Sequence, residues 1–326
     1  MGAASLLISL STLTRWTSGA LVCAASLVGG VGAACAGQAT ADATQSGLAG
    51  SPTRTSVVSP NWSGYAVTGR PGSRLRYSMA TGSWNEPTVT CGRKEEGTLS
   101  TIAVGLGGYG ATAEGDEQVG TDANCGASGK PTYFAWFEVS PYPAYSLPNK
   151  VRPGDALTAT VSILSAPHPP QIVVRVDDAT LGWSATREIS WVSPGTFFVA
   201  RGEPNGVGPT SPAASSAEWL VEAPASCRFF HCAEASLANF NSVSMTNISA
   251  VANGSSGTLT DRGWKVTRLV LVPGPVDVPN YPYSSPSAPG QSQPGTASSP
   301  AGATPGRAST DGRGFKVKWL AVAKGL

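Results

Sequence analysis

The stretch GDEQVGTDANC runs from residue 115 to residue 125. It contains an amide, Gln118, and a carboxylate, Asp122, at an even-numbered spacing along the chain. If this stretch is a strand, side-chain alternation places Gln118, Gly120 and Asp122 on one face and Val119 and Thr121 on the other. Such a face could hydrogen-bond a ligand lying above its glycine. The alternative is the solvated side of an ordinary strand, so the neighbouring strands must decide between the two.

The next alternating stretch, YFAWFEVSP, supplies a partner strand on which Trp136 and Glu138 share a face. The CGASGK segment between the two stretches suits a turn centred near Ser128. An antiparallel hairpin with that turn sets the register of the two strands. The predicted cross-strand pairs are Gln118 with Glu138, Gly120 with Trp136, and Asp122 with Phe134.

A third stretch, AEWLVEAP, repeats the pattern far along the chain. Its alternation places Glu218, Leu220 and Glu222 on one face, with Trp219 and Val221 turned toward a core. Each carboxylate by itself could be a solvated residue of an outer face. Together, the three stretches indicate a polar site built on a sheet.

The sequence lacks the side chains on which most hydrolases depend. It has only 2 histidines: His168 lies in Pro-His-Pro-Pro, typical of a surface loop, and His231 lies between two cysteines. Neither has a second histidine at metal-ligand spacing, and neither suits a Ser-His-Asp triad. There is no G-x-S-x-G elbow and no Asp-Thr/Ser-Gly pair. We therefore expect no metal and no cofactor, so that any catalysis must come from carboxylates and amides.

Short strands and turns are the elements that would position these side chains. Gly (39) and Pro (26) are abundant, only 13% of residues are charged, and no helical period is sustained beyond the N-terminus. More than ten short strands without helices predict an all-β fold, a β-sandwich or jelly roll. The expected strands cover residues 62–68, 75–85, 100–106, 117–121, 132–139, 156–164, 171–177, 186–191, 217–222, 243–252, 265–272 and 315–320.

Residues 1–41 have the layout of a secretory signal peptide. An apolar, small-residue run over residues 20–36 follows Arg15, and Ala39-Thr40-Ala41 is a suitable cleavage site. The run is too short and too interrupted by glycine to make a good spanning helix. Lipidation of Cys35 is the alternative. We expect a secreted protein with a short polar lead or pro-segment at 42–59 and a single domain at 60–326.

Export would permit disulfides. After removal of the signal peptide, Cys91, Cys125, Cys227 and Cys232 remain. They allow three pairings, of which the most local joins Cys91 to Cys125 and Cys227 to Cys232.

From residue 273 to residue 310 the composition shifts to Pro, Ser, Gly and Ala, with almost no charge. Alternation then returns in FKVKWL, which predicts a final strand near 314–321. We expect residues 273–310 to form a surface excursion between two strands of one domain. The alternative is a linker to a disordered tail.

The order and spacing of several motifs resemble those of the glutamic peptidases, or eqolisins. The resemblance spans most of residues 60–272 and the last strand. Its motifs are Asn61-Trp62-Ser63-Gly64, Gly82-Ser83-Trp84-Asn85-Glu86-Pro87, Gln118-Val119-Gly120-Thr121-Asp122, Tyr133-Phe134-Ala135-Trp136-Phe137-Glu138, Ala217-Glu218-Trp219-Leu220-Val221-Glu222 and Asp311-Gly312. It implies a secreted, acid-acting endopeptidase with an antiparallel β-sandwich of two curved sheets, concanavalin A-like.

The resemblance also implies roles for the polar residues. Gln118 takes the place of the catalytic glutamine and Glu222 that of the catalytic glutamate, while Asp122, Trp136 and Glu138 fall in the substrate cleft. A carboxylate can take a proton from an attacking water, and an amide can donate to the developing oxyanion. Because an amide does not titrate, it keeps this role in acid, where an imidazole would be protonated.

The sequence also departs from the family pattern. Ala103 and Gly107 stand where a cleft Trp and a cleft Asp are common, and Ala223-Pro224 stand where acidic residues usually follow the catalytic glutamate. Subsite preference and pH optimum therefore stay open. A net charge of +2 gives no case for nucleic acid or a polybasic membrane patch, and we expect a monomer that acts on polypeptides without stable membrane association. Two alternatives remain: a secreted glycoside hydrolase using Glu138 and Glu222, and a non-catalytic, lectin-like carbohydrate-binding module.

Overall fold

The computed structural model describes residues 54–321, with gaps at 60, 111–115, 127, 140–141, 143, 167–168, 192–211, 213, 229–230, 273, 277–296 and 300. The expected signal peptide, including Cys35, lies outside the described residues, and so does His168.

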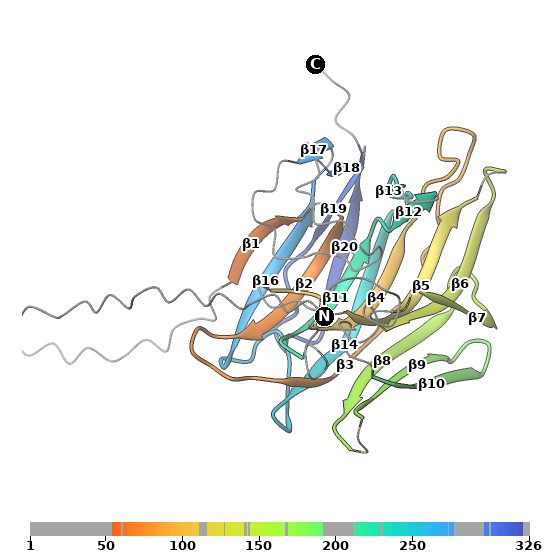
Figure 1. Cartoon of the computed structure of the whole chain (residues 1–326). Helices are drawn as coiled ribbons and strands as arrows, with labels where there is room; N and C mark the ends of the chain where they lie inside the picture. The colour runs from red at the N-terminus through yellow and green to blue at the C-terminus, as the bar shows by residue number, and fades with distance from the viewer. Residues whose placement is uncertain are drawn as a thin grey trace, which may run out of the picture. The chain divides into compact units, whose positions relative to one another are not determined.

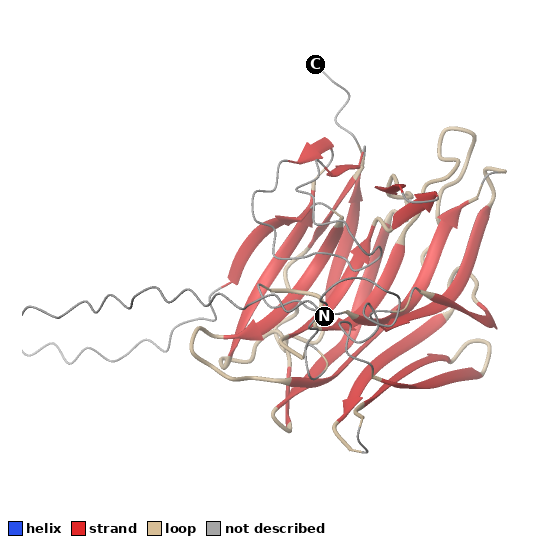
Figure 2. Cartoon of the chain, viewed as in Figure 1, coloured by secondary structure: helices blue, strands red, loops and turns tan. Residues whose placement is uncertain are grey.

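Strands make up the regular structure of the described part of the chain, which contains no helix (Figure 2). The all-β prediction is therefore confirmed there. The strands are β1 (Arg54–Ser59), β2 (Trp62–Gly69), β3 (Tyr77–Asn85), β4 (Thr101–Leu106), β5 (Glu117–Cys125), β6 (Pro131–Val139), β7 (Tyr145–Lys150), β8 (Ala156–Leu164), β9 (Gln171–Asp178), β10 (Trp183–Ser190), β11 (Ser216–Glu222), β12 (Ala225–Arg228), β13 (His231–Glu234), β14 (Ser242–Ala252), β15 (Ser255–Gly257), β16 (Trp264–Leu271), β17 (Gly274–Val276), β18 (Ala297–Ser299), β19 (Gly302–Pro305) and β20 (Phe315–Leu320).

Hydrogen bonds join most of these strands into one 16-stranded sheet, whose path is β10-β9-β8-β3-β14-β20-β19-β16-β2-β11-β4-β5-β6-β7 (Figure 1). The two separate sheets that were expected are not found as such, because β14 belongs to both halves. Its residues 242–245 pair with β20, and residues 246–252 pair with β3. At the two ends of the path, Trp183 Nε1 on β10 donates to the Lys150 carbonyl on β7 at 2.9 Å, so the sheet is nearly closed into a barrel.

Several strands lie where none was expected. β7 joins the sheet beside β6, and β17 and β18 pair with each other inside the expected excursion. Residues 54–59, assigned to the polar lead, form β1 and pair in parallel with β16. Residues 302–305, assigned to the excursion, form β19 and pair with β16 and β20. All other paired strands are antiparallel, and the final strand lies at Phe315–Leu320 as predicted.

Large apolar side chains from both halves of the sheet meet in one core. Trp84 on β3 and Trp219 on β11 are at most 2% exposed, and each indole finds a partner on a facing strand. Trp219 Nε1 donates to the Thr81 carbonyl at 2.8 Å, and Trp84 Nε1 donates to Thr121 Oγ1 at 3.1 Å. Burial of a large apolar side chain contributes about 1.5–3 kcal/mol, so these residues help to fix β3 beneath β5 and β11.

The predicted disulfide between Cys91 and Cys125 is present and fastens the end of β5 to the segment before β4. Cys227 and Cys232 are directly paired in the backbone register of the β12–β13 hairpin. Their side chains lie outside the described part, so their disulfide stays a prediction.

Candidate active site

One face of five neighbouring strands carries the side chains that the sequence singled out. Figure 1 shows these strands in the order β2, β11, β4, β5 and β6. Their cross-strand pairing aligns the residues of this face in three rows. The Gln118 row contains Ala66, Glu218, Gly105, Gln118 and Glu138. The central row contains Gly64, Leu220, Ala103, Gly120 and Trp136. The Glu222 row contains Trp62, Glu222, Thr101, Asp122 and Phe134.

The predicted hairpin register is confirmed, because β5 and β6 pair Gln118 with Glu138, Gly120 with Trp136, and Asp122 with Phe134. Gly120 was expected to leave space for a ligand above it, but the structure gives it a different role. A Cβ atom on Gly120 would lie 2.1 Å from the Ile102 carbonyl oxygen, so the glycine lets the backbone of β4 approach β5 closely.

Gln118 is only 4% exposed, and its amide is held from one side. Its Nε2 donates a hydrogen bond to Oδ2 of Asp116, which is 3% exposed. Gln118 Oε1 has no hydrogen-bond partner among the described residues. Sequence reasoning missed Asp116, although its position two residues before Gln118 places it on the same side of the chain.

Glu218 is the glutamate that approaches Gln118 across the sheet. Gly105 separates the two in their row, and a Cβ atom there would lie 3.2 Å from both Gln118 Cγ and Glu218 Oε2. Burial, followed by the charge of Asp116, raises the pKa of Glu218 to about 8. The same two causes raise the pKa of Glu138 above its ordinary value. These carboxyl groups are therefore neutral in acid.

The Glu222 row has its own hydrogen bonds. Asn61 Nδ2 donates to Glu222 Oε1 at 2.9 Å, and Glu222 is 8% exposed. Asp122 accepts from Thr101 Oγ1 at 2.5 Å and from Asn124 Nδ2 at 3.0 Å. Burial raises the pKa of Asp122 to about 6, although these hydrogen bonds oppose the shift.

Gln118 and Glu222 lie on the same face but in different rows. β4 runs between their strands, and their rows are four residues apart along the strands. With strands about 4.8 Å apart and a rise of about 3.3 Å per residue, a flat sheet would separate their Cα atoms by about 16 Å. A peptide lying over the central row would therefore have Gln118 on one side and Glu222 on the other.

The central row forms the floor between these two polar rows. Its Ala103 and Leu220 belong to an apolar cluster that is distinct from the main core. The other members of this cluster are Trp62, Ala66, Tyr109, Trp136 and Leu269, with Phe134 packed against them. An apolar floor between two rows of hydrogen-bonding groups is a common arrangement in ligand-binding sites.

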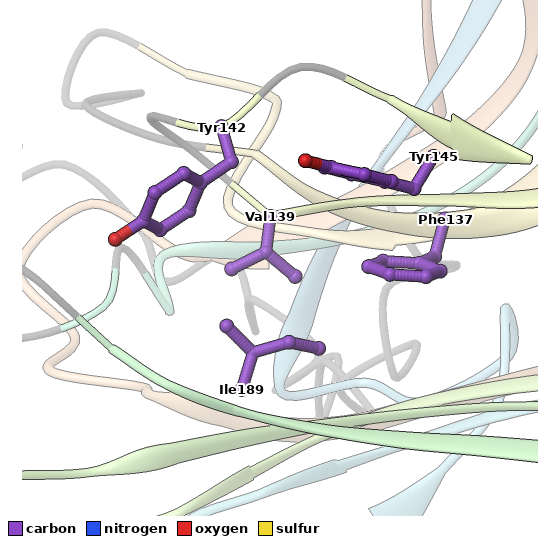
Figure 3. Close-up of a pocket in the computed structure, with 5 residues that line it drawn as sticks. All are labelled: Phe137, Val139, Tyr142, Tyr145 and Ile189. Atoms are coloured by element: carbon purple, nitrogen blue, oxygen red, sulfur yellow. The ribbon is translucent and has the colours of Figure 1, made fainter.

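An apolar pocket lies on the opposite face of β6 (Figure 3). Phe137 and Val139 line it from β6 and Ile189 from β10, while Tyr145 stacks on Phe137 with ring centroids 5.9 Å apart. Because alternation turns Phe137 and Val139 away from Trp136 and Glu138, this pocket is separate from the three rows.

Within the described ranges, no group of three or more His, Cys, Asp or Glu residues is arranged to hold a metal ion. A search of the same residues found no helix long and apolar enough to cross a membrane.

The sequence matches the model of the Peptidase A4 family over residues 60–269, a range that contains all three rows. The chain belongs to the Peptidase A4 family. It is therefore a hydrolase of peptide bonds, a glutamic-type endopeptidase, which decides against the glycoside hydrolase and the lectin-like module. No curated protein matches this A4 peptidase.

Two solved structures share the fold of this A4 peptidase. One is a crystal structure of Scytalido-glutamic peptidase with a peptide-based transition state analog, at 17% identity and a TM-score of 0.53. The other is SCP-B, a member of the Eqolisin family of peptidases, in a complex with the tripeptide Ala-Ile-His, at 18% identity and a TM-score of 0.50. Each alignment covers 81% of this chain and 100% of the other chain.

Proposed function

We propose that this A4 peptidase is an exported endopeptidase that works in acid, with Gln118 and Glu222 as its catalytic pair and an activated water as the nucleophile. The observation that carries the proposal is the strand register. It supports a single substrate-binding face on which Gln118, Glu222 and the three expected cleft residues Asp122, Trp136 and Glu138 all lie.

In this proposal the scissile peptide lies over Ala103 and Gly120, the small residues at the centre of the face. Glu222, as a carboxylate on one side, takes a proton from the water that attacks the carbonyl carbon. Gln118, on the other side, donates an amide N–H to the oxyanion that develops. One donor of this kind typically contributes about 100- to 1000-fold in rate. Glu222 then returns its proton to the leaving amine, so no covalent intermediate forms.

The ionisation of the buried carboxyl groups favours acid as the working condition. The raised pKa values of Glu138, Glu218 and Asp122 mean that all three are neutral below about pH 5 and become charged as the pH rises. Charged neighbours would repel one another across the Gln118 row. Gln118 keeps the same charge throughout, so its role is independent of this titration.

The proposal includes export as a monomer. The signal-like residues 1–41 and the Cys91–Cys125 disulfide support export, since disulfides persist in oxidising compartments. We also propose that the two halves of the sheet act as the layers of the predicted sandwich. The cross-core bond from Trp219 to Thr81 supports this part.

Digestion of a denatured protein by the purified secreted enzyme, in acid and at neutral pH, tests the proposed function. We expect cleavage in acid that persists with chelators, with serine- and cysteine-directed reagents and with pepstatin, because the proposed mechanism uses a water and no aspartic pair. Complete inhibition by a chelator would overturn the proposed activation of water. Absence of cleavage in acid would overturn the working condition.

A further inference from the structure

Asp116 is the side chain that holds the amide of Gln118. It directly precedes β5, and the Gln118 Nε2 donates to its Oδ2. Both residues are at least nine-tenths buried. A hydrogen bond to an ionised partner, out of reach of water, is stronger than the same bond between neutral groups.

The backbone around Asp116 leaves room for its carboxyl group. A Cβ atom on Gly108 would lie 3.0 Å from the carboxyl atoms of Asp116, and one on Gly105 would lie 3.5 Å from Oδ1. Larger residues at these positions would press on the carboxyl group. The carboxyl group therefore sits where β4 ends, next to the amide that it binds.

The charge of Asp116 affects the pKa values of three other carboxyl groups. That charge adds to burial in raising the pKa of Glu117, of Glu138 and of Glu218. Glu138 is directly opposite Gln118, and Glu218 approaches it over Gly105. Of these carboxyl groups, that of Asp116 is the one that accepts a hydrogen bond from Gln118.

We propose that Asp116 is a positioning residue that fixes the orientation of the Gln118 amide for catalysis. A primary amide has an oxygen and a nitrogen of similar size and can bind either way round. A carboxylate only accepts hydrogen bonds, so it selects the orientation in which Nε2 faces Asp116. One N–H then binds Asp116, while the second N–H stays available to the oxyanion. This inference rests on the proposed role of Gln118 and holds whichever glutamate is the base.

A double-mutant cycle in the full-length secreted enzyme tests the inference. Asp116→Ala should lower kcat about 10- to 100-fold with little change in KM, the usual worth of a hydrogen bond to a charged group. Asp116→Asn should recover only part of that loss, because its Oδ1 can accept the same bond while its Nδ2 can also donate and so no longer selects one orientation of the Gln118 amide. In a Gln118→Ala background, Asp116→Ala should cost scarcely any further turnover, since residues acting as a unit are non-additive. Asp116→Ser replaces the alanine variant if the latter does not fold.

The control is Asp178→Ala on β9. Asp178 is 1% exposed and accepts hydrogen bonds from the backbone N–H groups of Thr180 and Leu181, so its loss should lower the melting temperature and leave kcat unchanged. Full turnover of Asp116→Ala beside an inactive Gln118→Ala overturns this inference and leaves the proposed function standing. Additive losses in the double variant also overturn it, since they would show a role that does not pass through Gln118. Full turnover of Gln118→Ala overturns both.

Discussion

Glutamine in place of Glu218 would remove an ionisable group from the Gln118 row while keeping the size of the side chain. Glu218 is 1% exposed, and burial, with the charge of Asp116 second, raises its pKa from 4.5 to about 8. Because the pKa of Glu218 in the folded state lies above its unfolded value, Glu218 does not reduce the free energy of unfolding below about pH 4.5. As the pH rises toward about 8, keeping Glu218 protonated lowers the free energy of unfolding. At about pH 7 the loss amounts to about 3 kcal/mol, since one pKa unit corresponds to about 1.4 kcal/mol.

Glu218→Gln should therefore match the unaltered enzyme in stability at about pH 4 and exceed it by about 3 kcal/mol at about pH 7. Urea unfolding at the two pH values measures this difference. Glu188→Gln, at an exposed position of β10, is the matched control and should change neither value. Equal stability of Glu218→Gln and the unaltered enzyme at about pH 7 would refute the burial argument. Turnover of the same variant is informative as well, because a folded but inactive Glu218→Gln would make Glu218 the base in place of Glu222.

Three further changes have defined outcomes. Glu222→Gln should lower kcat about 100- to 10,000-fold, the usual range for a lost general base, with little change in melting temperature. Glu138→Gln should lower kcat less than Glu222→Gln does. A larger loss of kcat in Glu138→Gln would place the base on β6. Gln118→Glu should lower kcat increasingly as the pH rises, because the introduced carboxyl group can donate a hydrogen bond only while it is protonated and, once charged, repels the neighbouring carboxyl groups; a near-normal kcat at every pH would show that the amide is dispensable. Cys91→Ser opens a crosslink with a sequence separation of 34, and chain entropy predicts a loss of about 4 kcal/mol in the free energy of unfolding. An unchanged urea midpoint would contradict that estimate.

Local pattern was sufficient to predict the β5–β6 hairpin. A short turn and strict alternation leave one register in which Gln118 faces Glu138, and that register is the one found. The expected strands at 156–164 and 315–320 likewise match β8 and β20, because their alternation is uninterrupted.

Local pattern could not predict how strands that are distant in sequence pair with one another. The offset between Gln118 and Glu222 depends on how β4 aligns with both β5 and β11, and no turn connects β4 to β11. β1 was missed because it pairs with β16, far along the chain. β19 was missed because it is short and lies within the Pro/Ser/Gly-rich segment, although it pairs mainly with β20. Asp116 was missed because its proposed role depends on its side-chain contact with Gln118. The family motif begins at Gln118 and therefore does not contain Asp116.

The position of β2 has a consequence for how the enzyme is made. β2 lies near the start of the chain, yet it is hydrogen-bonded between β11 and β16, which end at residues 222 and 271. A nascent chain that stops short of these strands leaves β2 without either neighbour, and the floor and both polar rows are then incomplete. The face that carries these rows can form only when most of the polypeptide has left the ribosome. Any activity of this face therefore begins only after synthesis of the chain is nearly complete.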